Sequence, residues 1–168
     1  MSEFSKTLVV DAAGGQGVYP TIQSAVFELT PPRGNGGVII IESGVYNIES
    51  ESDIINIPSN TTIVGNGNVI INVKYNDIAI KNSLFVEGNE RITISGFKVN
   101  VLYDDSPYNK HLIYFRNVNN CLIEKLTITC EGTQGIYNDY IPPTEQYAAI
   151  LLYSSGENNN CINNIIRQ

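Results

Sequence analysis

The chain has 168 residues, of which 42% are hydrophobic, and this length supports one domain with a substantial core. Its formal net charge of -7 disfavours binding to the phosphate backbone of a nucleic acid. No apolar run approaches the roughly 20 residues that cross a bilayer, so the sequence does not predict membrane insertion.

The residue types favour β-structure. The apolar residues are mostly Ile and Val, Trp is absent, and Asn and Gly are abundant. β-Branched residues suit strands, whereas Asn and Gly suit the turns between them. We therefore expect an all-β fold in a single domain spanning residues 1–168.

Residues 1–36 are predicted to contain a strand, a glycine-rich loop and a helix. Leu8 to Val10 is a short apolar strand, and Asp11 to Gly17 is the loop. Between Thr21 and Leu29, apolar residues recur at helical spacing, with a threonine at the N-cap and Pro31-Pro32 as terminator. The residues expected on the buried face of this helix are Ile22, Ala25, Val26 and Leu29.

Residues 37–168 are predicted to form stacked coils. The first two strands are Gly37 to Ile41 and Gly44 to Ile48, separated by a turn at Glu42 to Gly44. After them, similar segments recur at unequal steps, which is the signature of a solenoid.

The steps of the repeat follow from three alignments. Ile63 matches Ile94 at a step of 31 residues, and the segment that begins at Ile92 matches the one at Cys121 at a step of 29. Two Asn-Asn-Cys triplets match at a step of 40, from Cys121 to Cys161. The final stretch, Asn159 to Gln168, is therefore predicted to begin a further coil that has no C-terminal cap.

Each unit is expected to begin with an apolar strand and to carry an insertion at one phase. The predicted strands are Ile54 to Ile57, Leu84 to Val86, Leu112 to Phe115 and Ala149 to Leu152. The insertions are Lys74 to Asn82, Leu102 to His111 and Cys130 to Tyr147. Insertions at one phase of a solenoid project from one face, which is often the binding face.

The N-terminal motifs resemble a known family. Val9-Val10-Asp11, Tyr19-Pro20-Thr21-Ile22-Gln23-Ser24-Ala25, Gly37 to Ile41 and Ser43-Gly44-Val45-Tyr46 look like the entrance to the right-handed parallel β-helix of the pectate-lyase superfamily. That superfamily includes pectin-degrading enzymes and phage tail-spike and appendage proteins. The resemblance implies a right-handed, single-stranded parallel β-helix whose N-terminal end is closed by the amphipathic helix.

The three cysteines are predicted to be core residues. Cys121, Cys130 and Cys161 are odd in number and lack C-x-x-C spacing, which argues against a disulfide framework and a zinc site. Cys121 takes the place of Ile92 one coil earlier, as a small apolar residue would. No metal site and no cofactor are predicted.

An enzyme of the resembled superfamily would use acidic or basic residues on neighbouring coils. The candidates are Asp104, Asp105, Asp77 and Arg116, and a lyase would also call for calcium bound by acidic groups. The paired aspartates resemble those of the polygalacturonase-like hydrolases, but the other motifs of those enzymes are missing. Aspartate before Ser-Pro is also ordinary turn chemistry.

Two basic residues near this cluster have structural alternatives. His111, the only histidine, lies at a predicted strand start, where a structural role competes with that of a base. Arg116 follows an inward Phe115 and is expected to point outward, with a role as a lyase base as the alternative.

A second pattern in the insertions favours binding. Tyrosines alternate there with Asn and Asp, a mixture that suits a glycan surface or a protein interface, with simple loop packing as the alternative. The predicted ligand-binding residues are Tyr75, Tyr103, Asp104, Asp105, Tyr108, Tyr137, Asp139 and Tyr140.

Two functions follow from the sequence. The first is a non-catalytic structural and adhesive module of a virus or phage appendage or an extracellular filament, which assembles into a homo-oligomer through its uncapped last coil. The alternative is a polysaccharide lyase or glycoside hydrolase, or a fragment of one, that acts on acidic polysaccharide. Met1 to Lys6 lacks the apolar core of a secretory signal, and the expected location is a virion or the extracellular surface.

Overall fold

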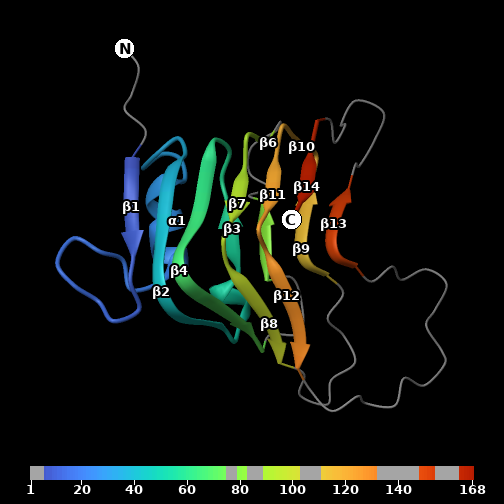
Figure 1. Ribbon diagram of the computed structural model, residues 1–168. Helices are drawn as coiled ribbons and strands as arrows, with labels where there is room; N and C mark the ends of the chain where they lie inside the picture. Colours follow the sequence, from blue (N-terminus) through green and yellow to red (C-terminus); the bar gives the residue numbers. More distant parts are fainter. Residues whose placement is uncertain (1–5, 75–78, 83–88, 103–110, 132–147, 154–162) are drawn as a thin grey trace.

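The computed structural model describes residues 6–74, 79–82, 89–102, 111–131, 148–153 and 163–168. These residues form a parallel β-solenoid of about four turns, with strands side by side along one axis (Figure 1). The prediction of one stacked parallel β-fold is therefore confirmed at this level.

Three parallel sheets make up the solenoid. The first contains β1 (Lys6–Val10), β2 (Gly37–Ile48), β4 (Thr61–Val73), β7 (Thr93–Ser95), β8 (Lys98–Leu102), β11 (Leu122–Glu124), β12 (Thr127–Glu131) and β14 (Ile165–Arg167). The second contains β3 (Ile55–Ile57), β5 (Ile80–Asn82), β9 (His111–Arg116) and β13 (Ala148–Tyr153). The third pairs β6 (Asn89–Glu90) with β10 (Val118–Asn119).

Helix α1 (Ile22–Leu29) forms where the sequence predicts it. The Thr21 hydroxyl accepts a hydrogen bond from the Ser24 N–H at 3.1 Å, and the helix ends before Pro31. The four predicted apolar residues of its inner face are all buried. The helix contacts β1, β2 and β3, so it joins the core beside the first turn.

Strand β2 corrects one prediction. The two strands expected on either side of Glu42 to Gly44 form a single strand from Gly37 to Ile48. The expected turn is only a register shift between Glu42 and Gly44, where β2 pairs with β4. The irregularity bends the strand without ending it, because both halves still pair with the same neighbour.

One inward row shows how the turns stack. Ile63 pairs with Ile94, and Ile94 pairs with Ile123, which confirms the predicted steps of 31 and 29 residues. The complete row is Leu8, Ile39, Ile63, Ile94, Ile123 and Ile166. Its four inner members are at most 2% exposed, so stacking of identical inward positions builds the core.

The predicted step of 40 residues at the last turn is wrong. Leu122 pairs with Ile165, so Asn164 takes the position of Cys121 at a separation of 43 residues. The Asn164 side chain accepts a hydrogen bond from Cys121 N–H at 3.0 Å and donates one to Val118 O at 2.9 Å. Cys161 itself lies outside the described residues.

A residue in the left-handed conformation forms the corner just before each of β4, β7, β11 and β14. Asn60, Arg91, Asn120 and Asn163 have φ values of 58°, 56°, 57° and 57° respectively, all in the left-handed region. Asn tolerates this conformation better than other non-glycine residues, which explains why Asn recurs at the corner.

The second sheet corrects another strand prediction. In the second turn, the strand of this sheet is Ile80 to Asn82, which lies inside the predicted insertion Lys74 to Asn82. The predicted strand, Leu84 to Val86, lies outside the described residues. Ile80 pairs with Ile55 on one side and Ile113 on the other. The chain thus returns to the core earlier than its apolar pattern suggested.

The prediction for Cys121 is confirmed. Its side chain is 2% exposed and belongs to the same core cluster as the inward isoleucines. No helix among the described residues is long and apolar enough to span a bilayer.

Candidate functional site

The predicted ligand-binding residues and the aspartates proposed for catalysis lie outside the part of the chain that the structure describes. They are Tyr75, Asp77, Tyr103, Asp104, Asp105, Tyr108, Tyr137, Asp139 and Tyr140. Their grouping on one face therefore stays a prediction. The structure describes only the strands that flank them.

Those flanking strands place the ends of the three segments side by side. Segments 75–78, 103–110 and 132–147 follow β4, β8 and β12, and these three strands are neighbours in the first sheet. Two of the strands into which the segments lead, β9 and β13, are paired, and β5 pairs with β9. The three segments thus leave and re-enter the solenoid at equivalent positions of consecutive turns.

Arg116 is the last residue of β9 and follows the buried Phe115. Its side chain is half-buried, with Nε shielded from solvent, and its role as a lyase base stays a prediction. The segment that holds Asp104 and Asp105 rejoins the sheet at His111, five residues earlier. At about 3.3 Å per residue, roughly 16 Å of strand separates Arg116 from that junction.

The described part of the solenoid carries a different polar feature that the sequence analysis missed. We define the outward amide row as Asn47, Asn72, Asn100 and Thr129, which occupy equivalent positions of β2, β4, β8 and β12. Buried Tyr46 and Ile48 flank Asn47, so the row lies on the face of the strands away from the core, where Asn100 is nonetheless only 8% exposed.

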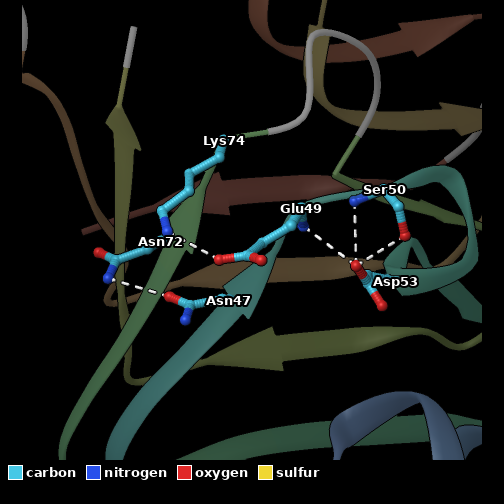
Figure 2. Close-up of polar contacts among 6 residues, drawn as sticks. All are labelled: Asn47, Glu49, Ser50, Asp53, Asn72 and Lys74. Carbon is cyan, nitrogen blue, oxygen red and sulfur yellow. Dashed lines mark hydrogen bonds and ion pairs between the residues drawn. The ribbon is translucent and has the colours of Figure 1, made fainter. Parts of the chain in front are cut away.

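Hydrogen bonds connect the row from turn to turn. The Asn72 amide donates to Asn47 Oδ1 at 3.3 Å, as Figure 2 shows, and the Asn100 amide donates to Asn72 Oδ1 at 3.3 Å. The Thr129 hydroxyl donates to Asn100 Oδ1 at 2.5 Å. Each amide is therefore engaged with its neighbour, and the row ties four turns together on the outside.

An ion pair and a turn extend this polar surface at the end of β2. The Lys74 ammonium lies 2.7 Å from Glu49 Oε1, and both side chains are about half exposed. Asp53 Oδ2 accepts hydrogen bonds from Glu49 N–H at 3.1 Å, Ser50 N–H at 2.9 Å and the Ser50 hydroxyl at 2.8 Å (Figure 2).

These contacts fix both the charge of Asp53 and the path of the chain. The hydrogen bond from the Ser50 hydroxyl, with the two backbone bonds, lowers the pKa of the Asp53 carboxyl against the effect of its partial burial. The Gln23 side-chain amide also donates to the Asp53 carbonyl, which links α1 to the short 3-10 helix η1 (Glu51–Asp53).

A hollow lies where the start of α1 meets β2. It has a cavity volume of about 130 Å³, and its lining includes Thr21, Gln23, Val45 and Tyr46. The Tyr46 hydroxyl donates to the Glu42 carbonyl at 2.9 Å, and burial raises the pKa of its phenol. These polar groups already have partners within the protein.

The sequence contains a short motif around each asparagine of the amide row. Val45-Tyr46-Asn47-Ile48, Ile70-Ile71-Asn72-Val73 and Lys98-Val99-Asn100-Val101 share one pattern, with Asn at its third position. The steps between these asparagines are 25 and 28 residues, shorter than the repeat identified at the corner, so one common step does not reveal them.

Neither a metal-binding cluster in the described part of the chain nor a match to a known protein was found. Across the described ranges, no group of three or more His, Cys, Asp or Glu side chains could hold a metal ion. Comparison of the chain with protein-family models, curated proteins and solved structures yields no match.

Proposed function

We propose that the chain is a non-catalytic structural and adhesive module of a virus or phage appendage or an extracellular filament. Its solenoid would be a right-handed β-helix of the pectate-lyase type, with α1 closing the core at the N-terminal end and the outer edge of β1 left for pairing with another strand. The module would self-assemble through its last turn and bind a glycan or a partner protein through the three Tyr-, Asn- and Asp-rich segments.

The observation that carries this proposal is the outward amide row. Its members use donors and acceptors on one another along the solenoid axis, which favours a role in stiffening the stack. In the proposal, recognition falls to the segments that start beside one another at the ends of β4, β8 and β12. Aromatic faces and amides in such segments suit sugar rings and their hydroxyls.

A glycan-binding panel tests the adhesive part. We expect binding to at least one polysaccharide, weakened strongly by Tyr103→Ala or Tyr137→Ala. Asn68→Ala is the control, because Asn68 is an exposed polar residue within β4 and outside these segments. Equal binding by all four proteins, or no binding by the folded chain across the panel, would contradict the adhesive role.

An activity panel tests the non-catalytic part. The chain is incubated with acidic polysaccharides, with and without calcium, while new reducing ends and unsaturated products are measured. We expect neither product. Turnover that disappears in Asp104→Ala or Asp105→Ala would overturn the proposal and establish the alternative, a lyase or hydrolase.

A further inference from the structure

Among the described residues, the two outermost strands of the first sheet each have one edge that no further strand of the sheet covers. β1 lies at one end of the strand order and β14 at the other (Figure 1). Within the described residues, β14 pairs with β11 alone, and β1 pairs with β2 and forms one isolated bridge to Tyr19. Open strand edges are templates for pairing with another chain.

The peptide groups of β14 that face its open edge can be identified. Ile165 N–H donates to Cys121 O at 2.9 Å, and Arg167 O accepts from Lys125 N–H at 3.3 Å, both on the β11 side. Alternate residues of a parallel strand bond to opposite neighbours. The N–H and C=O groups of Ile166 therefore point toward the open edge.

The same reasoning applies to β1. Tyr19 N–H donates to Val9 O at 2.8 Å on the edge away from β2. Val9 and Thr7, which are two residues apart, therefore direct their peptide groups to this outer edge. Tyr19 occupies the Val9 carbonyl, which leaves the Val9 N–H and the Thr7 carbonyl to bond with another strand.

These two edges are complementary in side chains as well as in hydrogen bonds. Leu8 and Ile166 are the terminal members of the inward row that β1 to β14 share. Ile166 is 53% exposed although Ile123, beside it in the row, is 2% exposed. Leu8 is only partly buried, so within the described residues neither end of this aliphatic row has a further neighbour in the sheet.

We infer that two copies of this chain stack head to tail, with β14 of one copy pairing in parallel with β1 of the next and Ile166 opposite Leu8. Ile166 N–H then donates to Thr7 O, and Val9 N–H donates to Ile166 O. The Tyr19 bond to Val9 O persists because β14 ends at Arg167, so that the Gln168 N–H, which would otherwise approach this carbonyl, stays outside the pairing. Such a heterologous contact repeats at every copy, so it produces open filaments.

This inference rests on the proposed structural role, because it names the partner surface for the self-assembly of that module. It adds that the acceptor of the last turn is the β1 edge of the same chain. A tail-to-tail pairing of two β14 strands is the competing arrangement, and it would give closed dimers.

The test uses the full chain and two blocking variants. Ile166→Lys places a charge in the row at the β14 end, and Val9→Pro removes the outward N–H of β1 without removing a bond to β2. Val45→Lys is the control, because Val45 is also 53% exposed but lies on the outward surface of β2. Circular dichroism checks that each variant is folded.

Sedimentation velocity over a concentration series, with electron microscopy, gives the readout. We expect reversible association of the wild-type chain and of Val45→Lys, and an apparent dissociation constant at least about tenfold higher for Ile166→Lys and for Val9→Pro. A mixture of the two blocked variants should form dimers and nothing longer, since the dimer uses the β1 edge of Ile166→Lys and the β14 edge of Val9→Pro and exposes only the two blocked edges.

Three results would overturn head-to-tail stacking. They are a wild-type chain that stays monomeric at its highest soluble concentration, dimers of Val9→Pro alone, and folded blocking variants that associate like the wild type. The glycan and activity panels are read on the blocked monomers as well. Failure of the stacking and failure of the proposed binding role are therefore separate outcomes.

Discussion

At the scale of single residues, the four corner residues differ in how well their side chains tolerate the left-handed conformation. Three of the four corner residues are Asn, and the fourth is Arg91 with a φ of 56°. Left-handed backbone costs a residue with a full side chain about 1 kcal/mol or more, whereas Asn tolerates it. The ion pair of Arg91 with Glu90 is 4.0 Å long and exposed, so it contributes little.

We therefore predict that Arg91→Asn raises the free energy of unfolding by about 0.5–1 kcal/mol. Urea denaturation at neutral pH measures the change. Arg91→Ala is the control, because it removes the charge but keeps a residue that disfavours this conformation. Equal gains from Asn and Ala would show that charge, and not backbone conformation, is responsible.

Two glycines of the first sheet offer a contrast in close packing. A Cβ at Gly65 would lie 2.2 Å from the carbonyl oxygen of Gly96 on the next turn, whereas one at Gly44 would meet nothing closer than 3.5 Å. We predict that Gly65→Ala lowers the free energy of unfolding by about 2 kcal/mol or more, because backbone must move. Gly44→Ala should change it by less than about 0.5 kcal/mol.

Thermal and urea denaturation of the two glycine variants provide the comparison. Both substitutions add one methyl group to a strand of the same sheet, so the difference between them isolates the contact between turns. Similar stability for Gly65→Ala and Gly44→Ala would mean that adjacent turns can move apart at Gly65 without a loss of free energy of unfolding.

Asp53 gives a prediction for pH dependence. Its pKa is lowered in the folded chain, chiefly by the Ser50 hydroxyl, so its ionised form stabilises the fold above its unfolded pKa of 3.8. That contribution is lost as the pH falls through the lowered folded value. Asp53→Asn should cost about 1 kcal/mol at pH 7 and progressively less below about pH 4.

Denaturation of wild type and Asp53→Asn across this pH range measures the difference. Glu51→Gln is a suitable control, because Glu51 is an exposed carboxylate in the same short helix. A difference between wild type and Asp53→Asn that stays constant down to pH 2 would exclude the ionised carboxylate as its source.

At the scale of elements, the N-cap of α1 is a local test of how the first turn is held. The Thr21 hydroxyl accepts from Ser24 N–H at 3.1 Å, and the helix behind it contributes four buried residues to the core. Thr21→Ala should cost about 1 kcal/mol, and Thr21→Asp should retain most of the stability, because it keeps an acceptor. Equal losses in both variants would assign the effect to packing instead of capping.

The elements also show what the sequence can and cannot predict. Helix α1 was predictable because its cap, its 3.6-residue period and Pro31 all agree. The inward isoleucine row was predictable because Ile63 and Ile94 lie in similar short segments. Local pattern and tertiary position agree in both cases.

The predicted register was wrong where the local sequence is ambiguous. Asn-Asn occurs twice near the last turn, and the pair that precedes Ile165 sets the corner instead of the pair that precedes Cys161. Only pairing with β11 distinguishes them, since both pairs suit a turn equally. The prediction also missed β5, which lies inside the predicted insertion Lys74 to Asn82. A strand this short needs only a few apolar residues, so the apolar pattern does not reveal it.

The candidate site was less predictable than the fold for a physical reason. Its predicted residues, such as Tyr103 and Asp104, fall in insertions whose path is not set by the repeat, and they lie outside the described residues. The outward amide row, by contrast, follows the repeat, and three local motifs contain it. Sequence alone shows that Asn47 and Asn72 are present, but their mutual hydrogen bond depends on the register between β2 and β4.

At the scale of the whole molecule, charge opposes the stacking that the strand edges favour. Each copy carries a formal net charge of -7, so a second copy approaches against net repulsion. The proposed contact between β14 and β1 is built from backbone hydrogen bonds and aliphatic side chains, which salt does not screen. Salt should therefore act mainly on the repulsion.

We predict that head-to-tail association strengthens as ionic strength rises from about 0.01 M to 0.15 M, where the screening length falls from about 30 Å to about 8 Å. Sedimentation velocity at fixed protein concentration measures the weight-average mass across this range. Ile166→Lys should stay monomeric throughout, because screening does not restore its missing aliphatic contact. Association that weakens with salt would instead indicate that ion pairs hold the copies together, which the β14 to β1 register does not provide.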